Sequence, residues 1–315
     1  MRDIKIALIQ QSFKGDRQLE QTAYLVEKAA SKANLVCLQE LHANHYFCQA
    51  QDLRNFDYAS NFKEQVAFFS DLAKNLKIVL VTSLFEERAP GLYHNTAVVF
   101  EKDGSIAGTY KKMHIPDDNN FYEKYYFTPG EQDSKDDLSL GFKPIDTSIG
   151  RLGILVCWDQ WYPEAARVMA LNGAEILIYP TAIGSLFSED ESERARQIDA
   201  WVTMQRSHAI ANGIYVASIN RVGKEGESLS AIYNPNAEVV AKSKDDKEGI
   251  DFFGNSFIAS PQGEILGRLD STKEGLLEAS LDMSEIARIR NIWPFLRDRR
   301  IDAYSDLLKR FAFKG

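Results

Sequence analysis

The sequence predicts a layered α/β protein, and two observations lead to this prediction. Short apolar, β-branched segments alternate along the chain with longer segments in which apolar residues recur at helical spacing. No linker, internal repeat or low-complexity tract interrupts the 315 residues, of which 44% are hydrophobic. Because folds of this class form single domains of about 250 residues or more, we expect one large domain.

The N-terminal part of the chain predicts a series of strands and two helices. Continuous or alternating apolar runs indicate strands, and apolar residues three or four apart indicate helices. The turn residues at 102–105 favour a hairpin. The expected strands are 4–10, 35–38, 78–84, 96–100 and 106–110, and the expected helices are 17–33 and 62–76.

The C-terminal part continues this alternation. An apolar strand at 154–156 leads directly to Cys157, and Pro163 opens the next helix, because proline is best tolerated in the first turn. Gly213 is the expected C-cap of a helix over 195–212. Further expected elements are strands at 175–179 and 214–220, a hairpin at 255–266 around Pro261, and a tail from Ser284 that is helical and then aromatic and basic.

Composition argues against several classes of protein. A formal net charge of −8 disfavours a nucleic-acid partner. Only three cysteines, without paired spacing, argue against a disulfide framework and for a reducing compartment. The residues after Met1 are already strand-like, and no run approaches the roughly 18 apolar residues that span a bilayer. We therefore expect a cytoplasmic protein with neither a nucleic-acid nor a membrane partner.

Three side chains that can carry chemistry follow predicted strands: Glu40, Lys112 and Cys157. Side chains just beyond the carboxyl ends of strands converge in sheets of this kind, so we expect these three in one crevice. Each alone is weak evidence, since buried cysteines and charged surface residues are usually structural. Together they supply a nucleophile, a carboxylate that takes and returns its proton, and a cation for an oxyanion. Hydrolysis of an amide-like C–N bond requires this set.

The segments around these residues resemble the three signatures of the nitrilase superfamily of carbon-nitrogen hydrolases. They are Leu38-Gln-Glu-Leu41, Gly108-Thr-Tyr-Lys-Lys-Met-His-Ile-Pro116 and Gly153-Ile-Leu-Val-Cys-Trp-Asp-Gln-Trp-Tyr-Pro-Glu164. The resemblance covers nearly the whole chain. It implies a four-layer α-β-β-α sandwich, with two mixed sheets flanked by helices, and catalytic roles for Glu40, Lys112 and Cys157. Lys111 stands where the family usually has an arginine, whose planar fork a lysine cannot reproduce.

Longer strings are similar to the N-carbamoylputrescine amidases within this superfamily. The resemblance implies that Glu123 lies against the catalytic lysine and helps to position substrate. It also places Asp117, Tyr122 and the backbone N–H of Trp158 at the substrate site. The similar strings are 114–117, 122–130, 157–167, 179–185 and 217–221.

One position near this site departs from the pattern. Members of the group often have an acidic residue directly after Ile-Gly-Ser, where the distal amine of the substrate is met. This chain has Leu186 there. Acidic residues follow closely and could still hold a cationic tail; they are Glu189, Asp190, Glu191 and Glu193.

The expected activity is hydrolysis of the ureido C–N bond of N-carbamoylputrescine through a covalent Cys157 adduct. The expected partner is a small carbamoyl amine, and no cofactor or metal is expected, because the cysteines and histidines lack ligand spacing. The resemblance implies a hydrolase domain over 1–280. A C-terminal extension over 281–315 is expected to pack on the domain or on a neighbouring subunit of a homo-oligomer, either a dimer or a multiple of dimers.

Three alternatives remain open from the sequence. A β-ureidopropionase or an N-carbamoyl amino acid amidohydrolase would need a cation for the substrate carboxylate, and the candidates are Arg194, Arg196 and Arg206. A papain-like Cys-His hydrolase would need a histidine base, chosen from His42, His45, His94, His114 and His208. A non-catalytic member of the superfamily would be expected to have lost one of the three catalytic residues.

Overall fold

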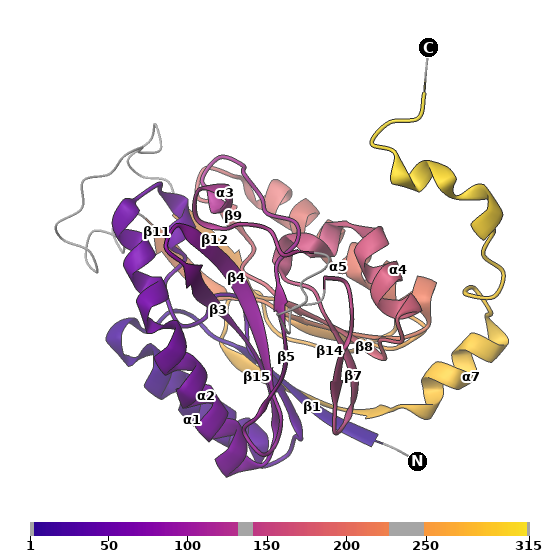
Figure 1. Cartoon of the computed structure of the whole chain (residues 1–315), viewed down its shortest axis with the longest axis horizontal. Helices are drawn as coiled ribbons and strands as arrows, with labels where there is room; N and C mark the ends of the chain where they lie inside the picture. The colour runs from indigo at the N-terminus through magenta and orange to yellow at the C-terminus, as the bar shows by residue number, and fades with distance from the viewer. Residues whose placement is uncertain (1–2, 132–140, 227–248, 314–315) are drawn as a thin grey trace.

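Two six-stranded mixed sheets form the centre of the protein (Figure 1). The computed structural model describes residues 3–131, 141–226 and 249–313. The first sheet has the order β15-β1-β2-β3-β4-β5, and the second has the order β14-β13-β10-β8-β7-β6. The strands of the first sheet are β1 (Asp3–Gln10), β2 (Leu35–Cys37), β3 (Val79–Ala89), β4 (Leu92–Phe100), β5 (Ile106–Lys111) and β15 (Gly275–Asp282). Those of the second are β6 (Ile145–Thr147), β7 (Gly150–Ile154), β8 (Ile176–Pro180), β10 (Tyr215–Ile219), β13 (Phe257–Ala259) and β14 (Ile265–Arg268).

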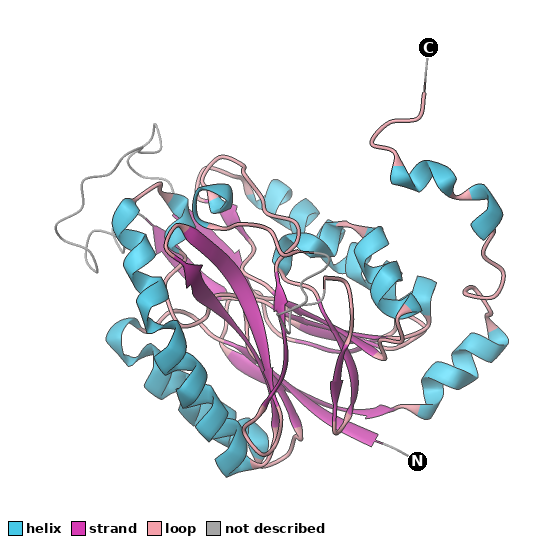
Figure 2. Ribbon diagram, viewed as in Figure 1, coloured by secondary structure: helices cyan, strands magenta, loops and turns pink. Residues whose placement is uncertain are grey.

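Helices cover the outer faces of both sheets, so the expected four-layer α-β-β-α architecture is confirmed (Figure 2). Helices α1 (Gln18–Ala30) and α2 (Phe62–Leu76) cover the first sheet, and α4 (Pro163–Leu171) and α5 (Glu191–Asn212) cover the second. Two further helices are the short α3 (Glu123–Tyr126) and the C-terminal α7 (Ser284–Ile292). Within the described ranges, no helix combines the length and the apolar character that crossing a membrane requires.

The period of two along β1 explains how the first sheet separates two layers of core. Ile6 and Leu8 belong to the apolar cluster between the sheets, whereas Ala7 and Ile9 belong to the cluster beneath α1 and α2. Successive side chains of a strand point to opposite faces, so one strand contributes to both cores. The strand is therefore buried on both sides, as its apolar sequence predicts.

Most of the predicted elements are confirmed, and the main differences involve strands that pair with distant parts of the chain. The helix at 62–76 and the C-cap at Gly213, with φ of 58°, are as expected. The strand before Cys157 is β7, which ends at Ile154, so the chain leaves the sheet three residues before the thiol. The sequence did not indicate β15, which pairs with β1 across the length of the chain, nor a small third sheet. That sheet consists of β9 (Gly184–Leu186), β11 (Val222–Gly226) and β12 (Gly249–Phe253).

The C-terminal segment packs on the domain and then leaves it. The expected boundary at residue 280 falls inside β15, because that strand continues to Asp282. Helix α7 follows and buries Ile286 and Ile289 against the domain. Beyond it the apolar side chains are exposed, for example 93% for Leu308 and 78% for Phe311. Figure 1 shows this part of the chain extending away from the sandwich.

We expect the exposed tail to be covered by a second copy of the chain, because large apolar side chains are rarely left in water at this density. The double variant Leu308→Asp/Phe311→Asp should therefore reduce the mass of the particle in light scattering after gel filtration. Leu53→Asp is the control, since Leu53 is 65% exposed elsewhere on the surface. A monomeric wild-type protein, or a double variant with unchanged mass, would contradict this expectation.

Candidate active site

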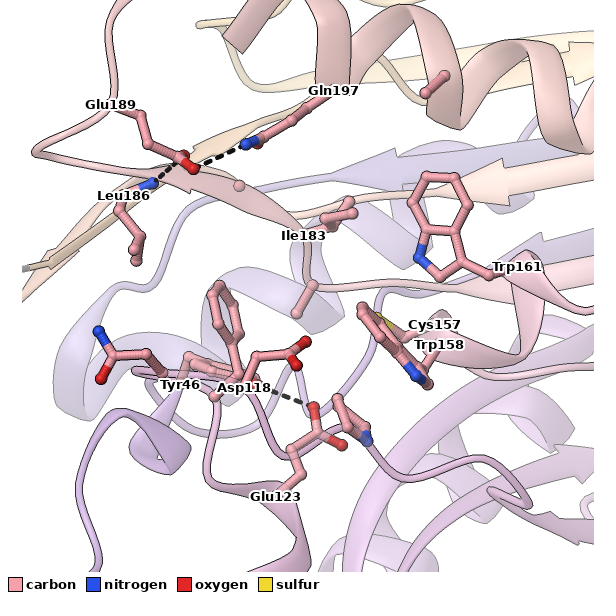
Figure 3. Close-up of a pocket in the computed structure, with 16 residues that line it drawn as sticks. Tyr46, Asp118, Glu123, Cys157, Trp158, Trp161, Ile183, Leu186, Glu189 and Gln197 are labelled. Atoms are coloured by element: carbon pink, nitrogen blue, oxygen red, sulfur yellow. Dashed lines mark hydrogen bonds between the residues drawn. The ribbon is translucent and has the colours of Figure 1, made fainter. Parts of the chain in front are cut away.

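The two sheets bring the three predicted side chains together. Glu40 follows β2 and Lys112 follows β5 of the first sheet, whereas Cys157 follows β7 of the second. Glu40 and Lys112 are fully buried, and Cys157 is 5% exposed. Cys157 lines a cavity of about 590 Å³ together with Glu123 and Trp158 (Figure 3).

The ammonium of Lys112 lies between two buried carboxylates. Lys112 Nζ donates to Glu40 Oε1 at 2.7 Å and to Glu123 Oε2 at 2.6 Å. Asn95 Nδ2 donates to the same oxygen of Glu40 at 2.7 Å. The other carboxylate oxygen, Glu40 Oε2, is buried and has no hydrogen-bond partner in the described part of the chain. One oxygen of Glu40 is thus held by a cation while the other can accept a proton.

Cys157 occupies a strained backbone conformation. Its φ is +45°, a left-handed value that L-residues other than glycine rarely adopt. The residue opens a 3₁₀ turn, η4 (Cys157–Trp161), which precedes α4. Such conformations persist where the surrounding structure enforces them, and they cluster at functional sites.

Asp159 enforces this turn and joins it to the strand that precedes Lys112. Its Oδ2 accepts from the Val156 N–H at 2.9 Å and from the Tyr110 hydroxyl at 2.8 Å. Its Oδ1 accepts from the His114 N–H at 3.0 Å. One buried carboxylate therefore fixes the turn of the nucleophile relative to the chain on both sides of Lys112.

Burial and neighbouring charges set the protonation states. Burial raises the pKa of the Cys157 thiol well above its usual value, and Glu40 acts in the same direction; Lys112 and a hydrogen bond from the Ala182 backbone oppose this only in part. Burial alone would lower the pKa of Lys112, but the carboxylates of Glu123 and Glu40 outweigh it and hold that pKa well above its usual value. These shifts favour a neutral thiol and a charged ammonium, so Cys157 would need a base to become a thiolate.

Glu123 lies against Lys112 and is also held from the opposite side. The Tyr46 hydroxyl donates to Glu123 Oε1 at 2.7 Å, a contact drawn in Figure 3. Glu123 opens the short helix α3 and is buried. Sequence inspection did not single out Tyr46, because its contact with Glu123 spans 77 residues of the chain.

The structure places Asp117 and Tyr122 outside the cavity lining. Asp117 is exposed, and its neighbour Asp118 lines the cavity instead. The chain turns sharply here: Asp118 forms a bridge with Phe121, and Asn120 has φ of +65°. The Tyr122 hydroxyl is directed to Asn119 at 3.2 Å. A turn of this kind decides which of two adjacent aspartates faces the cavity.

Acidic and apolar side chains line the part of the cavity opposite Glu123 in Figure 3. Glu189 Oε2 accepts from the Leu186 N–H at 2.8 Å, and Glu189 Oε1 accepts from Gln197 Nε2 at 2.8 Å. These contacts hold a carboxylate beside Leu186, the position that is often acidic in the group of proteins that this chain resembles. With Asp118, the lining of the whole cavity includes two acidic side chains besides Glu123, and the described residues that line it include no lysine or arginine.

The candidate arginines for a substrate carboxylate are engaged elsewhere. Arg194 pairs with Asp251 at 3.1 Å, Arg196 pairs with Glu193 at 2.5 Å, and Arg206 donates to the Gly263 carbonyl at 2.8 Å. The five histidines, all in the described ranges, are also absent from the lining of the Cys157 cavity. Nor do the described residues contain a group of three or more His, Cys, Asp or Glu side chains arranged for a metal ion.

Comparison with known proteins agrees with this geometry. The family model of the carbon-nitrogen hydrolases matches residues 5–291. The chain is 39% identical over 287 residues to N-carbamoylputrescine amidase of Arabidopsis thaliana, covering 90% of this chain and 87% of the relative. It is 36% identical over 318 residues to citrullinase of Francisella tularensis subsp. tularensis, covering 99% and 100% of the two chains.

A solved structure extends the similarity to three dimensions. The carbon-nitrogen hydrolase from Helicobacter pylori G27 matches with a TM-score of 0.88 and 51% sequence identity, over 98% of this chain and 100% of that one. The expected superfamily is thereby confirmed, and this chain belongs to the carbon-nitrogen hydrolases of the nitrilase superfamily.

Proposed function

We propose that this protein hydrolyses the ureido C–N bond of N-carbamoylputrescine, releasing putrescine, carbon dioxide and ammonia. The charge of the cavity is the observation that carries this choice of substrate. Asp118 and Glu189 line its wall, and the described lining residues include no lysine or arginine. A substrate with a distal ammonium is attracted by such a wall, whereas a substrate carboxylate is repelled.

The reaction begins with proton transfer from the Cys157 thiol to the unpartnered oxygen of Glu40. The thiolate attacks the ureido carbon, and Lys112 and the backbone N–H of Trp158 stabilise the oxyanion. Collapse of the tetrahedral adduct breaks the bond to the terminal nitrogen, which leaves as ammonia with the proton held by Glu40. Glu123 and Tyr46 hold Lys112 in place from the far side.

Water completes the cycle. Glu40 takes a proton from the water that attacks the carbamoyl thioester, and the thiolate of Cys157 leaves and is reprotonated. The released carbamate decomposes to carbon dioxide and putrescine. Glu40 thus acts as base in both halves of the reaction, which requires that one of its oxygens stay free of permanent hydrogen bonds.

Citrulline is the second candidate substrate, favoured by the alignment with citrullinase over 99% of this chain. It has the same ureido group and a distal amine, but it adds a carboxylate. The two candidate substrates therefore differ in one charged group, the carboxylate at the distal end of citrulline.

A substrate panel tests the proposal. Ammonia release should give the highest kcat/KM with N-carbamoylputrescine, a lower value with citrulline and the lowest with N-carbamoyl-β-alanine. Glu189→Gln should raise KM for N-carbamoylputrescine about tenfold, because a charge-assisted contact contributes roughly 1.5 kcal/mol or more. Glu191→Gln is the control, since Glu191 is exposed on the same segment. A higher kcat/KM for citrulline would reject the proposed substrate.

Lys112→Ala should reduce kcat by about 100-fold or more, because loss of a preorganised oxyanion donor costs on the order of 3 kcal/mol of barrier. Lys124→Ala removes an exposed lysine next to Glu123 and should leave kcat within twofold. Circular dichroism of both variants shows whether the fold is retained. Near-normal turnover by Lys112→Ala would remove this residue from the mechanism.

The protonation of Glu123 should be visible in the pH dependence of stability. Burial raises the pKa of Glu123 to about 7, and nearby Glu40 adds to this effect, although Lys112 and Tyr46 oppose it. The folded state therefore binds this proton more tightly than the unfolded state. The contribution to the free energy of unfolding is fully present below about pH 4.5 and is lost as the pH rises through 7.

Urea denaturation of wild type and Glu123→Gln at several pH values measures this contribution. The free energy of unfolding of wild type, minus that of the variant, should fall between about pH 5 and pH 7 and level off above that range. A difference that is constant, or that grows with pH, would show that Glu123 does not carry a raised pKa.

A further inference from the structure

A buried ion pair lies next to the catalytic cluster without lining the cavity. Arg221 follows β10 and is 1% exposed, and Glu225 lies in β11 and is 3% exposed. Arg221 Nη1 donates to Glu225 Oε1 at 2.7 Å. The mechanism above uses neither residue.

The guanidinium of Arg221 holds the backbone that carries Glu40. Nη2 donates to the carbonyls of Glu40 at 3.2 Å and Leu41 at 3.0 Å, and Nη1 also donates to the Asn44 carbonyl at 3.1 Å. These carbonyls belong to the segment that leaves the first sheet after β2, whereas Arg221 comes from the end of a strand of the second sheet. The guanidinium of Arg221 thus connects the segment that follows Glu40 to the second sheet, which carries Cys157.

The segment after Glu40 has an unfavourable backbone conformation that neighbouring contacts must stabilise. Leu41, directly after Glu40, has φ of +46°, which is unfavourable for a leucine. Such a backbone persists only where neighbouring contacts enforce it. Arg221 supplies hydrogen bonds to the carbonyls of the two peptide units that flank the Leu41 Cα, and Ser83 Oγ accepts from the Leu41 N–H at 3.2 Å.

The other half of the ion pair reaches the opposite side of the cluster. Glu225 Oε2 accepts from the Tyr46 N–H at 2.6 Å, and the Tyr46 hydroxyl in turn donates to Glu123 (Figure 3). The pair therefore fixes both ends of the segment from Glu40 to Tyr46. Each end delivers one group to the cluster around Lys112.

We propose that the Arg221–Glu225 ion pair positions Glu40 as the base for Cys157. Stability alone is a weak reason for such a pair, because removing two charges from water costs about as much as their attraction returns. Orientation is a stronger reason, since a carboxylate that must present one free oxygen depends on the backbone that carries it. The proposal rests on the assignment of Glu40 as base under the proposed function.

Arg221→Lys keeps the charge but removes the fork that spans two carbonyls. We expect kcat to fall at least tenfold while KM stays within threefold. The rate of Cys157 alkylation by iodoacetamide at pH 7, located by mass spectrometry, should fall by a similar factor, and this readout needs no substrate. Arg290→Lys is the matched control, because Arg290 is half-buried and donates to the Asn212 carbonyl at 3.0 Å outside the cavity lining. It should change neither rate more than twofold.

Combination with Glu40→Gln separates positioning from a general structural effect. If Arg221 acts through Glu40, Arg221→Lys should not slow alkylation further in the Glu40→Gln background, since contacts that act as a unit are not additive. Glu225→Gln, which keeps the side-chain shape and the charge of Arg221, should lower the alkylation rate at least threefold. It replaces Arg221→Lys in the comparison if that variant does not fold.

Three results would overturn the proposal. One is that Arg221→Lys is alkylated at the control rate while Glu40→Gln is alkylated slowly. If Arg221→Lys does not fold, Glu225→Gln takes its place in this comparison. This result rejects the positioning role of Arg221 and leaves the proposed function intact. The second is a multiplicative loss in the double variant, which indicates a structural role independent of Glu40. The third is alkylation at the wild-type rate in Glu40→Gln, which would reject the base assignment, and the positioning proposal with it.

Discussion

The ammonium of Lys112 between the carboxylates of Glu40 and Glu123 is the interaction on which the rest of the site depends. All three groups are buried, and two carboxylates at this depth are tolerated only with a cation between them. The cation stabilises a carboxylate near Cys157 although one of its oxygens has no hydrogen-bond partner in the described part of the chain. Asn95 and Tyr46 are buried beside this cluster, and each donates to one of the carboxylates.

The site forms where the two sheets meet, so its geometry depends on contacts between them. The first sheet supplies Glu40 and Lys112, and the second supplies Cys157. Asp159 connects the nucleophile turn to the chain around Lys112. Cys157 and Leu41, the residue after Glu40, both have left-handed backbones, which persist where the surrounding structure enforces them.

Under the proposed function, reaction and substrate choice lie in different parts of this cavity. The buried cluster at one side breaks the ureido C–N bond, a group that N-carbamoylputrescine and citrulline share. Asp118 is drawn near Tyr46 and Glu123 in Figure 3. Under the proposed function, the distal end of the substrate meets the opposite wall, which carries Leu186 and Glu189. A change of charge on that wall would alter specificity while leaving the chemistry unchanged, which fits a chain that is similar both to N-carbamoylputrescine amidase and to citrullinase.

The sequence alone determined the local structure and the family: the strand and helix periods, the cap at Gly213, and the three signatures around Glu40, Lys112 and Cys157. These depend on neighbouring residues, so they can be read along the chain. Contacts between distant segments were decided only by the tertiary structure. Strand β15 pairs with β1, and Arg221 donates hydrogen bonds to the segment after β2; both contacts join residues more than a hundred positions apart. The choice of Asp118 over Asp117 depends on the backbone of one turn, because adjacent side chains point in different directions.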